Sequence, residues 1–442
     1  MSDAYMMKLR NAVLLVLSLG LLAGCSVLPR KNAVPPGVGA HQEVEGVQNV
    51  PGIRYPIFSQ EGVNQMLQDL ERGAGAPGYR NDPNRGDTAN YLSLSGGGDN
   101  GAFGAGLLTG WTKHGGRPEF DLVTGVSTGA LIAPFAFLGP AYDDVLRQVY
   151  TEITRRDVFR QLGLMGALFG EAYADSSPLF GLISQHIDEV VLDKVAYQYK
   201  ERNRWLLMAT TDLDAGIPVL WNMGQIASVG TPEALNLFRK IMLASSSVPG
   251  AFPPVMFDVM VDDQRFQEMH VDGAASMQVF MYPSAVGANM GRSGIVSPYK
   301  NREVYIIRNA RLDSDWRQIE RSTLSIMGRS ISQLINSQGY GDLHRIYLTS
   351  LRDDVGFNLA FIGPDFDMQR RTPFDPAYMQ ALYDYGHRLG RAGYPWMHVP
   401  PGFEQAVNLD VKQQVKRKKQ VLIRAESMTG ADGVGSGSRK SP

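Results

Sequence analysis

Short segments in which apolar and polar residues alternate recur along the chain, and stretches that suit helices separate them. Strands are expected at 91–95, 120–124, 205–211, 217–222 and 304–308. Helices are expected at 102–111, 130–138 and 322–338, where small apolar residues are dense or apolar residues recur at helical spacing. Strands that alternate with helices predict an α/β fold with a mostly parallel central sheet flanked by helices.

The composition is that of an ordinary globular protein. Of the 442 residues, 44% are hydrophobic and 20% are charged, which excludes a mainly disordered or fibrous chain. The 43 Lys and Arg against 44 Asp and Glu give a net charge of −1, so nothing indicates a nucleic acid as partner. The single cysteine, Cys25, excludes an intrachain disulfide. The oligomeric state stays open.

The N-terminal segment has the pattern of a secretory signal. Lys8 and Arg10 precede an apolar run, 12–23, that is too short for a membrane-spanning helix of about 20 residues. The run ends in Leu-Ala-Gly-Cys25, which resembles a bacterial lipobox and implies lipidation of Cys25. Because Ser26 follows instead of an aspartate, the resemblance implies a lipid-anchored protein of the bacterial cell envelope, at the outer membrane. An ordinary signal peptide with a chance cysteine is the alternative.

A candidate nucleophile lies between an expected strand and an expected helix. Gly125-Val-Ser127-Thr-Gly129 fits G-x-S-x-G. A sharp turn at this point needs Gly or small residues beside the serine, and it lifts the hydroxyl above the sheet in front of the helix N-terminus. The pentapeptide alone is weak, because a glycine-rich turn capped by a serine has the same sequence. The two interpretations are equal on this motif alone.

A second glycine-rich segment follows the strand expected at 91–95. Gly96-Gly97-Gly98-Asp-Asn-Gly101 fits the dinucleotide-binding pattern. That pattern needs an acidic residue at the end of the second strand, where 125–129 stands instead. Consecutive glycines also suit the presentation of backbone N–H groups to the oxyanion of acyl transfer.

A serine nucleophile needs a proton acceptor, and the chain has seven histidines. The most specific setting is His270-Val-Asp272-Gly273-Ala274, in which Asp272 is expected to end a strand and Gly273 to turn it. His270 would face the same side of that strand as Asp272 and could assist it, although a structural role is favoured. An aspartate base predicts activity well below pH 6 unless burial raises its pKa strongly, whereas a histidine base loses activity near pH 6.5.

In this order the motifs resemble those of the patatin-like phospholipases. The segment 244–254 (ASSSVPGAFPP) is a further specific likeness, and the resemblance covers about 91–283. It implies a three-layer patatin-like fold and a dyad of Ser127 as nucleophile and Asp272 as base, without a histidine. It also implies an oxyanion hole at Gly96, Gly97, Gly98 and Gly101, a nucleophile elbow at Gly125 and Gly129, and an Asp-Gly-Ala motif completed by Gly273 and Ala274.

The resemblance implies hydrolysis of acyl esters of membrane lipids, of the phospholipase or lysophospholipase type, without a cofactor. Asn100 stands where many family members have Arg or Lys, so the rate or the substrate charge preference could differ. The alternative function is a catalytically idle, lipid-binding envelope lipoprotein that keeps the fold. No metal is expected, because no His or Cys cluster has zinc spacing and Asp212 and Asp214 lack the further ligands of a calcium loop.

These features divide the chain into six parts. Residues 1–24 are expected to be a signal peptide, 25–52 a lipidated tether, 53–90 an N-terminal extension, 91–283 the catalytic domain, 284–410 a C-terminal part packed on it, and 411–442 a basic, disordered tail. The apolar run 162–169 suits a mobile cover and a buried loop equally well.

Overall fold

The computed structural model describes residues 30–36, 43–74, 87–161, 172, 174–290, 299–313, 316 and 318–403. The expected signal peptide with Cys25, the apolar run 162–169 and the tail 411–442 lie outside the described residues.

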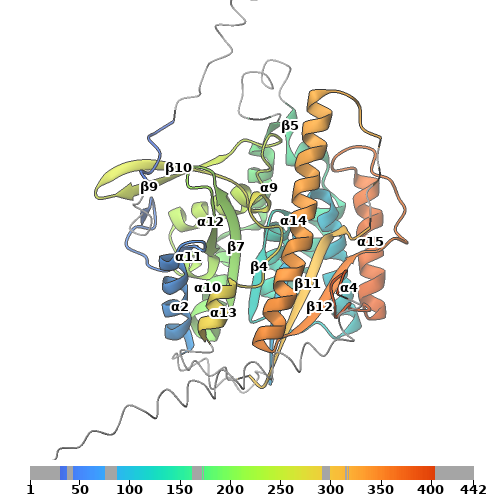
Figure 1. Cartoon of the computed structure of the whole chain (residues 1–442), viewed down its shortest axis with the longest axis horizontal. Helices are drawn as coiled ribbons and strands as arrows, with labels where there is room; N and C mark the ends of the chain where they lie inside the picture. Colours follow the sequence, from blue (N-terminus) through green and yellow to red (C-terminus); the bar gives the residue numbers. More distant parts are fainter. Residues whose placement is uncertain are drawn as a thin grey trace, which may run out of the picture.

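The expected α/β architecture is confirmed, and its centre is a parallel sheet (Figure 1). The parallel strands, in spatial order, are β7 (Trp205–Asp212), β4 (Leu122–Gly125), β3 (Thr88–Leu94), β11 (Asn301–Arg311) and β12 (Gly356–Ile362). Antiparallel strands extend the sheet beyond β7: β10 (Gln264–Asp272), β9 (Val255–Val261), β1 (Glu43–Val44), β8 (Ile217–Asn222) and β2 (Arg54–Pro56). A separate pair joins β5 (Arg160–Gln161) to β6 (Ala174–Asp175).

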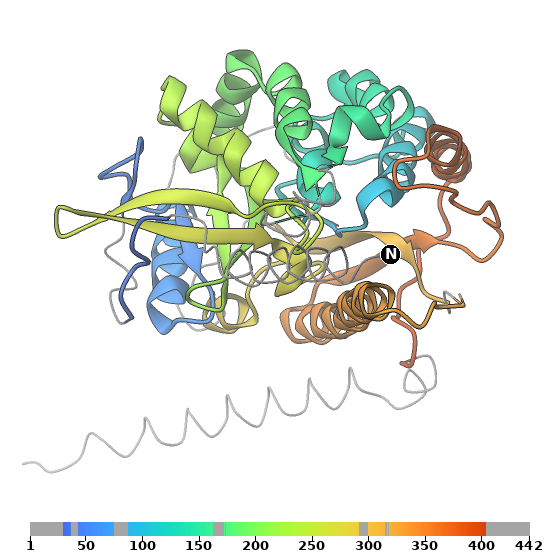
Figure 2. The same ribbon diagram turned by 90° about the horizontal axis from the view of Figure 1, so that it is seen from above.

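Helices cover both faces of the sheet, so the molecule has three layers (Figure 2). One face carries α4 (Gly101–His114), α5 (Thr128–Leu138), α6 (Asp143–Thr151), α9 (Ser177–His186), α10 (Glu189–Arg202), α12 (Pro232–Ser245) and α15 (Pro376–Ala392). The other face carries α2 (Gln60–Ala74), α13 (Ser284–Met290) and α14 (Thr323–Asp353). The described residues also include the short helices α7 (Arg155–Val158) and α11 (Met223–Ala227). One large apolar cluster lies under the first layer and two smaller ones under the second.

The C-terminal part shares the sheet of the preceding domain. Strand β11 pairs directly with β3, and β12 pairs with β11. The segment expected to pack on the catalytic domain thus contributes two strands to its sheet, and one of them, β11, contains the strand expected at 304–308. None of the helices within the described residues is long and apolar enough to cross a lipid bilayer.

Helices α4 and α15 pack at backbone distance. A Cβ on Gly110 would lie 2.8 Å from the carbonyl carbon of His387, and one on Gly390 would lie 2.7 Å from the amide nitrogen of Trp111. Real Cβ atoms essentially never come within 3.0 Å of another heavy atom in this way, so both positions require glycine. Since α4 begins directly at the glycine-rich loop, this contact also fixes the helix on which the loop is mounted.

Gly110→Ala is expected to lower the free energy of unfolding by about 1–3 kcal/mol, the usual cost of overpacking. The matched control is Gly181→Ala in α9, where a Cβ meets no atom within 4 Å. That change is expected to stabilise the protein by up to about 1 kcal/mol through helix propensity. Urea unfolding of both variants measures the difference, and equal stabilities would contradict the close packing.

Candidate active site

Ser127 occupies a strained turn between β4 and α5. Its backbone has φ 54° and ψ −126°, a conformation that typically costs a residue with a side chain about 1–3 kcal/mol. The flanking glycines are needed for close packing, because a Cβ on Gly125 would lie 2.6 Å from the carbonyl oxygen of Gly129. A Cβ on Gly129 would in turn lie 2.8 Å from the carbonyl oxygen of Ser95. Such stored strain is typical of functional residues.

The serine-rich segment after α12 holds this turn in place. The Ser127 amide donates to Oγ of Ser245 (3.0 Å), whose hydroxyl donates to the carbonyl of Ala209 in β7 (2.7 Å). The carbonyl of Ser247 accepts a hydrogen bond of 2.9 Å from the Asp272 amide. The segment 244–254 therefore links the two candidate catalytic residues. Its sequence had indicated only a family likeness, because these bonds connect residues more than 20 positions apart.

Asp272 ends β10, as its sequence setting predicted. Its carboxyl is buried, and its Oδ1 accepts a hydrogen bond of 2.8 Å from the Ala274 amide. Gly273 permits the turn because a Cβ there would lie 2.5 Å from the carbonyl oxygen of Ala209. The other oxygen, Oδ2, is buried and has no hydrogen-bond partner among the described residues. Asp272 thus has one anchored oxygen and one that is available to a proton.

Burial changes the acidity of Asp272. It raises the pKa of this carboxyl to about 7, although the nearby Ser127 hydroxyl and the Ala274 amide lower the pKa in part. The Ser127 hydroxyl is therefore close enough to act on the carboxyl, while its distance or angle falls short of a hydrogen bond to Oδ2. A base whose pKa is about 7 matches neutral pH. A pH profile alone therefore does not distinguish it from a histidine.

Two of the four amides expected at the oxyanion hole, those of Gly97 and Gly98, can donate to a ligand, and the other two already have acceptors. The Gly96 amide donates to the carbonyl of Gln278 (3.1 Å), and the Gly101 amide donates within the short helical turn to the carbonyl of Gly98. These two amides of the expected set of four therefore already donate to backbone carbonyls. Within the described residues the amides of Gly97 and Gly98 have no acceptor.

Ser127, Asp272 and these amides line one cavity of about 890 Å³. The cavity lies at the carboxyl ends of β4, β3 and β11, and the N-terminal half of α14 forms part of its wall. A Cβ on Gly96 would lie 3.2 Å from Cβ of Ser127 and 3.8 Å from Cβ of Ala274, so the loop, the nucleophile candidate and the Asp-Gly-Ala motif adjoin.

The central part of the chain resembles known proteins. Residues 92–281 match the sequence profile of the family described as patatin-like phospholipase. The chain contains a patatin-like phospholipase domain. The crystal structure of VipD from Legionella pneumophila aligns with 10% sequence identity and a TM-score of 0.29, over 70% of this chain and 67% of that chain. No curated protein matches the chain in a sequence search.

A second, apolar pocket of about 90 Å³ adjoins the first and shares Gly98, Ser127 and Val248 with it. Its wall consists mainly of aliphatic and aromatic side chains from α5, α6, α9 and α12, among them Leu131, Phe135, Ile183 and Met242. Because Ser127 lines both spaces, a bound ester can place its carbonyl at the serine, its apolar part in this pocket and its polar part in the larger cavity.

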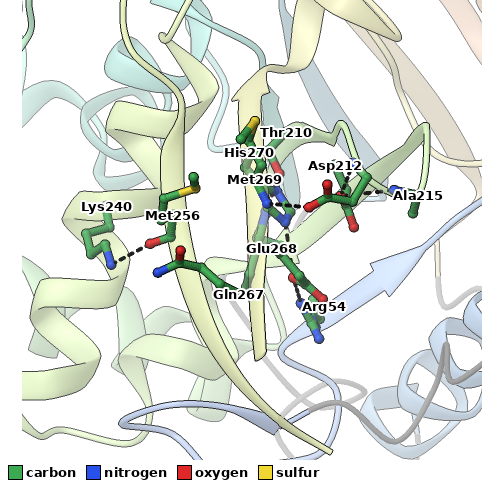
Figure 3. Close-up of polar contacts among 12 residues, drawn as sticks. Arg54, Thr210, Asp212, Ala215, Lys240, Met256, Gln267, Glu268, Met269 and His270 are labelled. Atoms are coloured by element: carbon green, nitrogen blue, oxygen red, sulfur yellow. Dashed lines mark hydrogen bonds and ion pairs between the residues drawn. The ribbon is translucent and has the colours of Figure 1, made fainter. Parts of the chain in front are cut away.

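His270 belongs to a separate buried cluster (Figure 3). Its Nδ1 contacts the Thr210 hydroxyl at 2.8 Å and its Nε2 contacts Glu268 at 3.1 Å, while Arg54 reaches the same carboxylate at 2.6 Å. Although burial opposes ionisation, Arg54 and His270 lower the pKa of Glu268 to about 2. The ring makes no bond to Asp272, so the structural role favoured from the sequence fits His270 better than a catalytic one.

The same cluster contains three side chains that are grouped closely enough to be considered as metal ligands. Within the described part of the chain, ligand atoms of Asp212, Glu268 and His270 lie within 4.8 Å of one another. Arg54 already supplies a positive charge to Glu268, so a cation between these groups would face a guanidinium. We assign no metal to this cluster.

The remaining histidines lie apart from the dyad candidates. In the described residues, His114, His344 and His398 contact the backbone carbonyls of Arg391, Pro401 and Phe357. His186 lines the apolar pocket, where burial lowers its pKa. His387 stacks on Tyr383, and His41 lies outside the described residues. None of those described hydrogen-bonds to Ser127 or Asp272.

Asp272→Asn is expected to stabilise the protein at alkaline pH. The folded state holds the carboxyl pKa at about 7, against an ordinary 3.8. Between these two pH values the folded protein holds the proton that the unfolded chain has released. The contribution of this group to the free energy of unfolding is therefore complete below about pH 4 and is lost as the pH rises to 7. The loss is on the order of 4 kcal/mol. Thermal unfolding should therefore show a larger advantage of the variant over wild type at pH 8 than at pH 4. An equal difference at both pH values would contradict the buried, raised carboxyl.

Proposed function

We propose that this protein is a lipid acyl hydrolase that works through an acyl-Ser127 intermediate. The observation that carries the proposal is a strained Ser127 that shares one cavity with the buried Asp272 carboxyl and two backbone amides without acceptors. The membership of 92–281 in the patatin-like phospholipase family supports a lipid ester as the substrate class.

In the proposed first step, Oγ of Ser127 bonds to the ester carbonyl carbon and its proton passes to Oδ2 of Asp272. Negative charge then develops on the carbonyl oxygen, where the Gly97 and Gly98 amides donate hydrogen bonds. One such donor typically contributes about 3 kcal/mol of transition-state stabilisation. Collapse breaks the bond to the leaving alcohol, which takes the proton from Asp272, and water then releases the acyl group by the same steps.

The Asp272 base must be ionised before it accepts a proton. Because burial raises its pKa to about 7, the proposal gives an enzyme whose kcat/KM falls as pH drops below about 7. This is the case that the sequence analysis set apart, in which burial raises the pKa of the aspartate strongly. The apolar pocket beside Ser127 suits the acyl chain, and the larger cavity suits the remainder of the lipid.

We also propose that the domain acts at a membrane to which lipidated Cys25 anchors it. This rests on the sequence pattern around Cys25 alone. An anchor would keep the site at a lipid surface and raise the effective concentration of its substrate.

Ser127→Ala is expected to abolish hydrolysis of a soluble short-chain ester and of a phospholipid while leaving the fold intact, since the change removes one oxygen. Asp272→Asn should lower the rate by about 10² to 10⁴, the usual contribution of general-base catalysis. Rates are measured by fatty-acid release, with folding checked by circular dichroism.

Two controls interpret these losses. Asp262→Asn changes an exposed carboxylate at the β9–β10 turn and should leave the rate near that of wild type. His270→Ala should lower the melting temperature far more than it lowers the rate of the folded protein. A wild-type rate in Ser127→Ala, or no hydrolysis of any ester by wild type, would contradict the proposal, and the second outcome would favour an idle lipid-binding protein.

Cys25→Ser is expected to give an unprocessed precursor or a protein released from the membrane, because the thiol that carries the lipid is gone. Membrane fractionation and the mass of the mature protein measure this. Normal processing together with normal membrane association in the variant would contradict the anchor.

A further inference from the structure

Arg308 is a buried cation without a hydrogen-bond partner in the wall of the catalytic cavity. The side chain is 0% exposed, and none of its three guanidinium nitrogens has a partner among the described residues. The group lies over the ring of Tyr340, with Cζ 4.8 Å from the ring centroid. Buried charges are normally paired, so an unpaired one that is kept next to a cavity suggests an anionic ligand.

The fold places Arg308 close to the nucleophile. Strand β11 pairs with β3, and the Ser95 amide donates to the carbonyl of Ile307, so Arg308 stands beside the start of the glycine-rich loop. Gln278 lies between the nucleophile and Arg308. A Cβ on Gly96 would lie 3.8 Å from Cγ of Gln278, and the same Cβ would also contact Ser127 and Ala274.

Gln278 also approaches Arg308 on its other side. Its Oε1 and Nη1 of Arg308 are the atoms nearest to a Cβ built on Gly339 of α14, and Oε1 too has no partner among the described residues. A continuous wall thus runs from Ser127 through Gln278 to Arg308. No hydrogen bond has to break for the guanidinium to turn into the cavity.

The neighbouring charges are already engaged. Asp342 is the carboxylate that attracts the charge of Arg308 electrostatically. It already accepts hydrogen bonds from the Gln278 and Val279 amides and from Arg345. Two other arginines of the cavity wall have acidic partners, since Arg311 pairs with Asp313 and Arg370 with Asp99. Arg308 is fully buried, and this burial lowers the pKa of its guanidinium.

We propose that Arg308, with Gln278 beside it, forms a subsite for the phosphate of a phosphoglyceride substrate. The proposal rests on the proposed acyl hydrolase function and adds its headgroup class. Guanidinium groups suit phosphate because their planar donors can bind two oxygens at once. In this arrangement the acyl chain lies in the apolar pocket, the ester carbonyl at Ser127 and the phosphate at Arg308. Arg308 thereby supplies, from another strand, a positive charge that Asn100 does not.

The first test compares two soluble substrates that differ only in the phosphate, 1-octanoylglycerol and 1-octanoylglycerol 3-phosphate, below their micelle concentrations. Arg308→Met should lower the ratio of kcat/KM for the phosphate ester to that for the neutral ester by about 10- to 100-fold, the usual value of a charged hydrogen bond. Arg308→Lys should restore part of the ratio. The control, Arg147→Met, removes an arginine that pairs with Glu152 outside both pockets and should leave the ratio unchanged.

Stability separates a ligand site from a structural arginine. Because the buried guanidinium has no hydrogen-bond partner to lose among the described residues, Arg308→Met should melt at the wild-type temperature or higher. A structural role instead predicts a lower melting temperature in Arg308→Met that Arg308→Lys does not repair, together with an unchanged ratio.

The second test does not depend on hydrolysis. Isothermal titration of Ser127→Ala with sn-glycerol 3-phosphate and with inorganic phosphate should show binding that is lost in Ser127→Ala/Arg308→Met. If wild type hydrolyses no ester but this binding is present and depends on Arg308, the acyl hydrolase function fails while the phosphate site stands. Binding of inorganic phosphate with an unchanged substrate ratio would mean a free-anion site and would overturn the headgroup assignment. An unchanged ratio with no binding would overturn the site altogether.

Discussion

The Asp272 carboxyl lies buried at the level of the sheet where the neighbouring parallel strands end, and the rest of the site depends on keeping it there. Burial raises its pKa to about 7, so the folded protein carries an ionised group at alkaline pH that it solvates poorly. The Ala274 amide, the Ser247 carbonyl and the pairing of β10 with β7 hold its backbone and one oxygen in place. The folded protein thus loses stability at alkaline pH by keeping a carboxyl whose pKa suits the proposed role of a base at neutral pH.

Strain at Ser127 follows from the same geometry. The serine must rise above the sheet to reach the cavity, and its backbone accepts a left-handed φ of 54° to do so. Glycines at 125 and 129 make room for the turn, and the Ser245 hydroxyl ties it to β7. The glycine-dependent packing of α4 on α15 then holds the donor loop. The proposed nucleophile, base and oxyanion donors therefore follow different strands of one sheet.

The local parts of this arrangement could be predicted from the sequence, and the long-range parts could not. The turn at Ser127 and the strand end at Asp272 are encoded within a few residues by glycine and by alternation. The long helix α14 and strand β12, which complete the cavity, have no local signal that ties them to it. The role of Ser245 and the burial of Arg308 depend on residues brought together by the sheet, as does the pKa of Asp272. Burial is a tertiary property, so no spacing rule reports it.

Fluorophosphonate labelling at a series of pH values, with the modified peptide identified by mass spectrometry, tests the central claim most directly. A phosphonylated Ser127 reports the nucleophile, and the rate of its formation reports the state of the base. The account predicts one adduct, on Ser127, whose rate rises through about pH 7 in wild type and is slow and without that transition in Asp272→Asn. An adduct on another residue, no adduct at all, or an unchanged pH transition in Asp272→Asn would contradict the account.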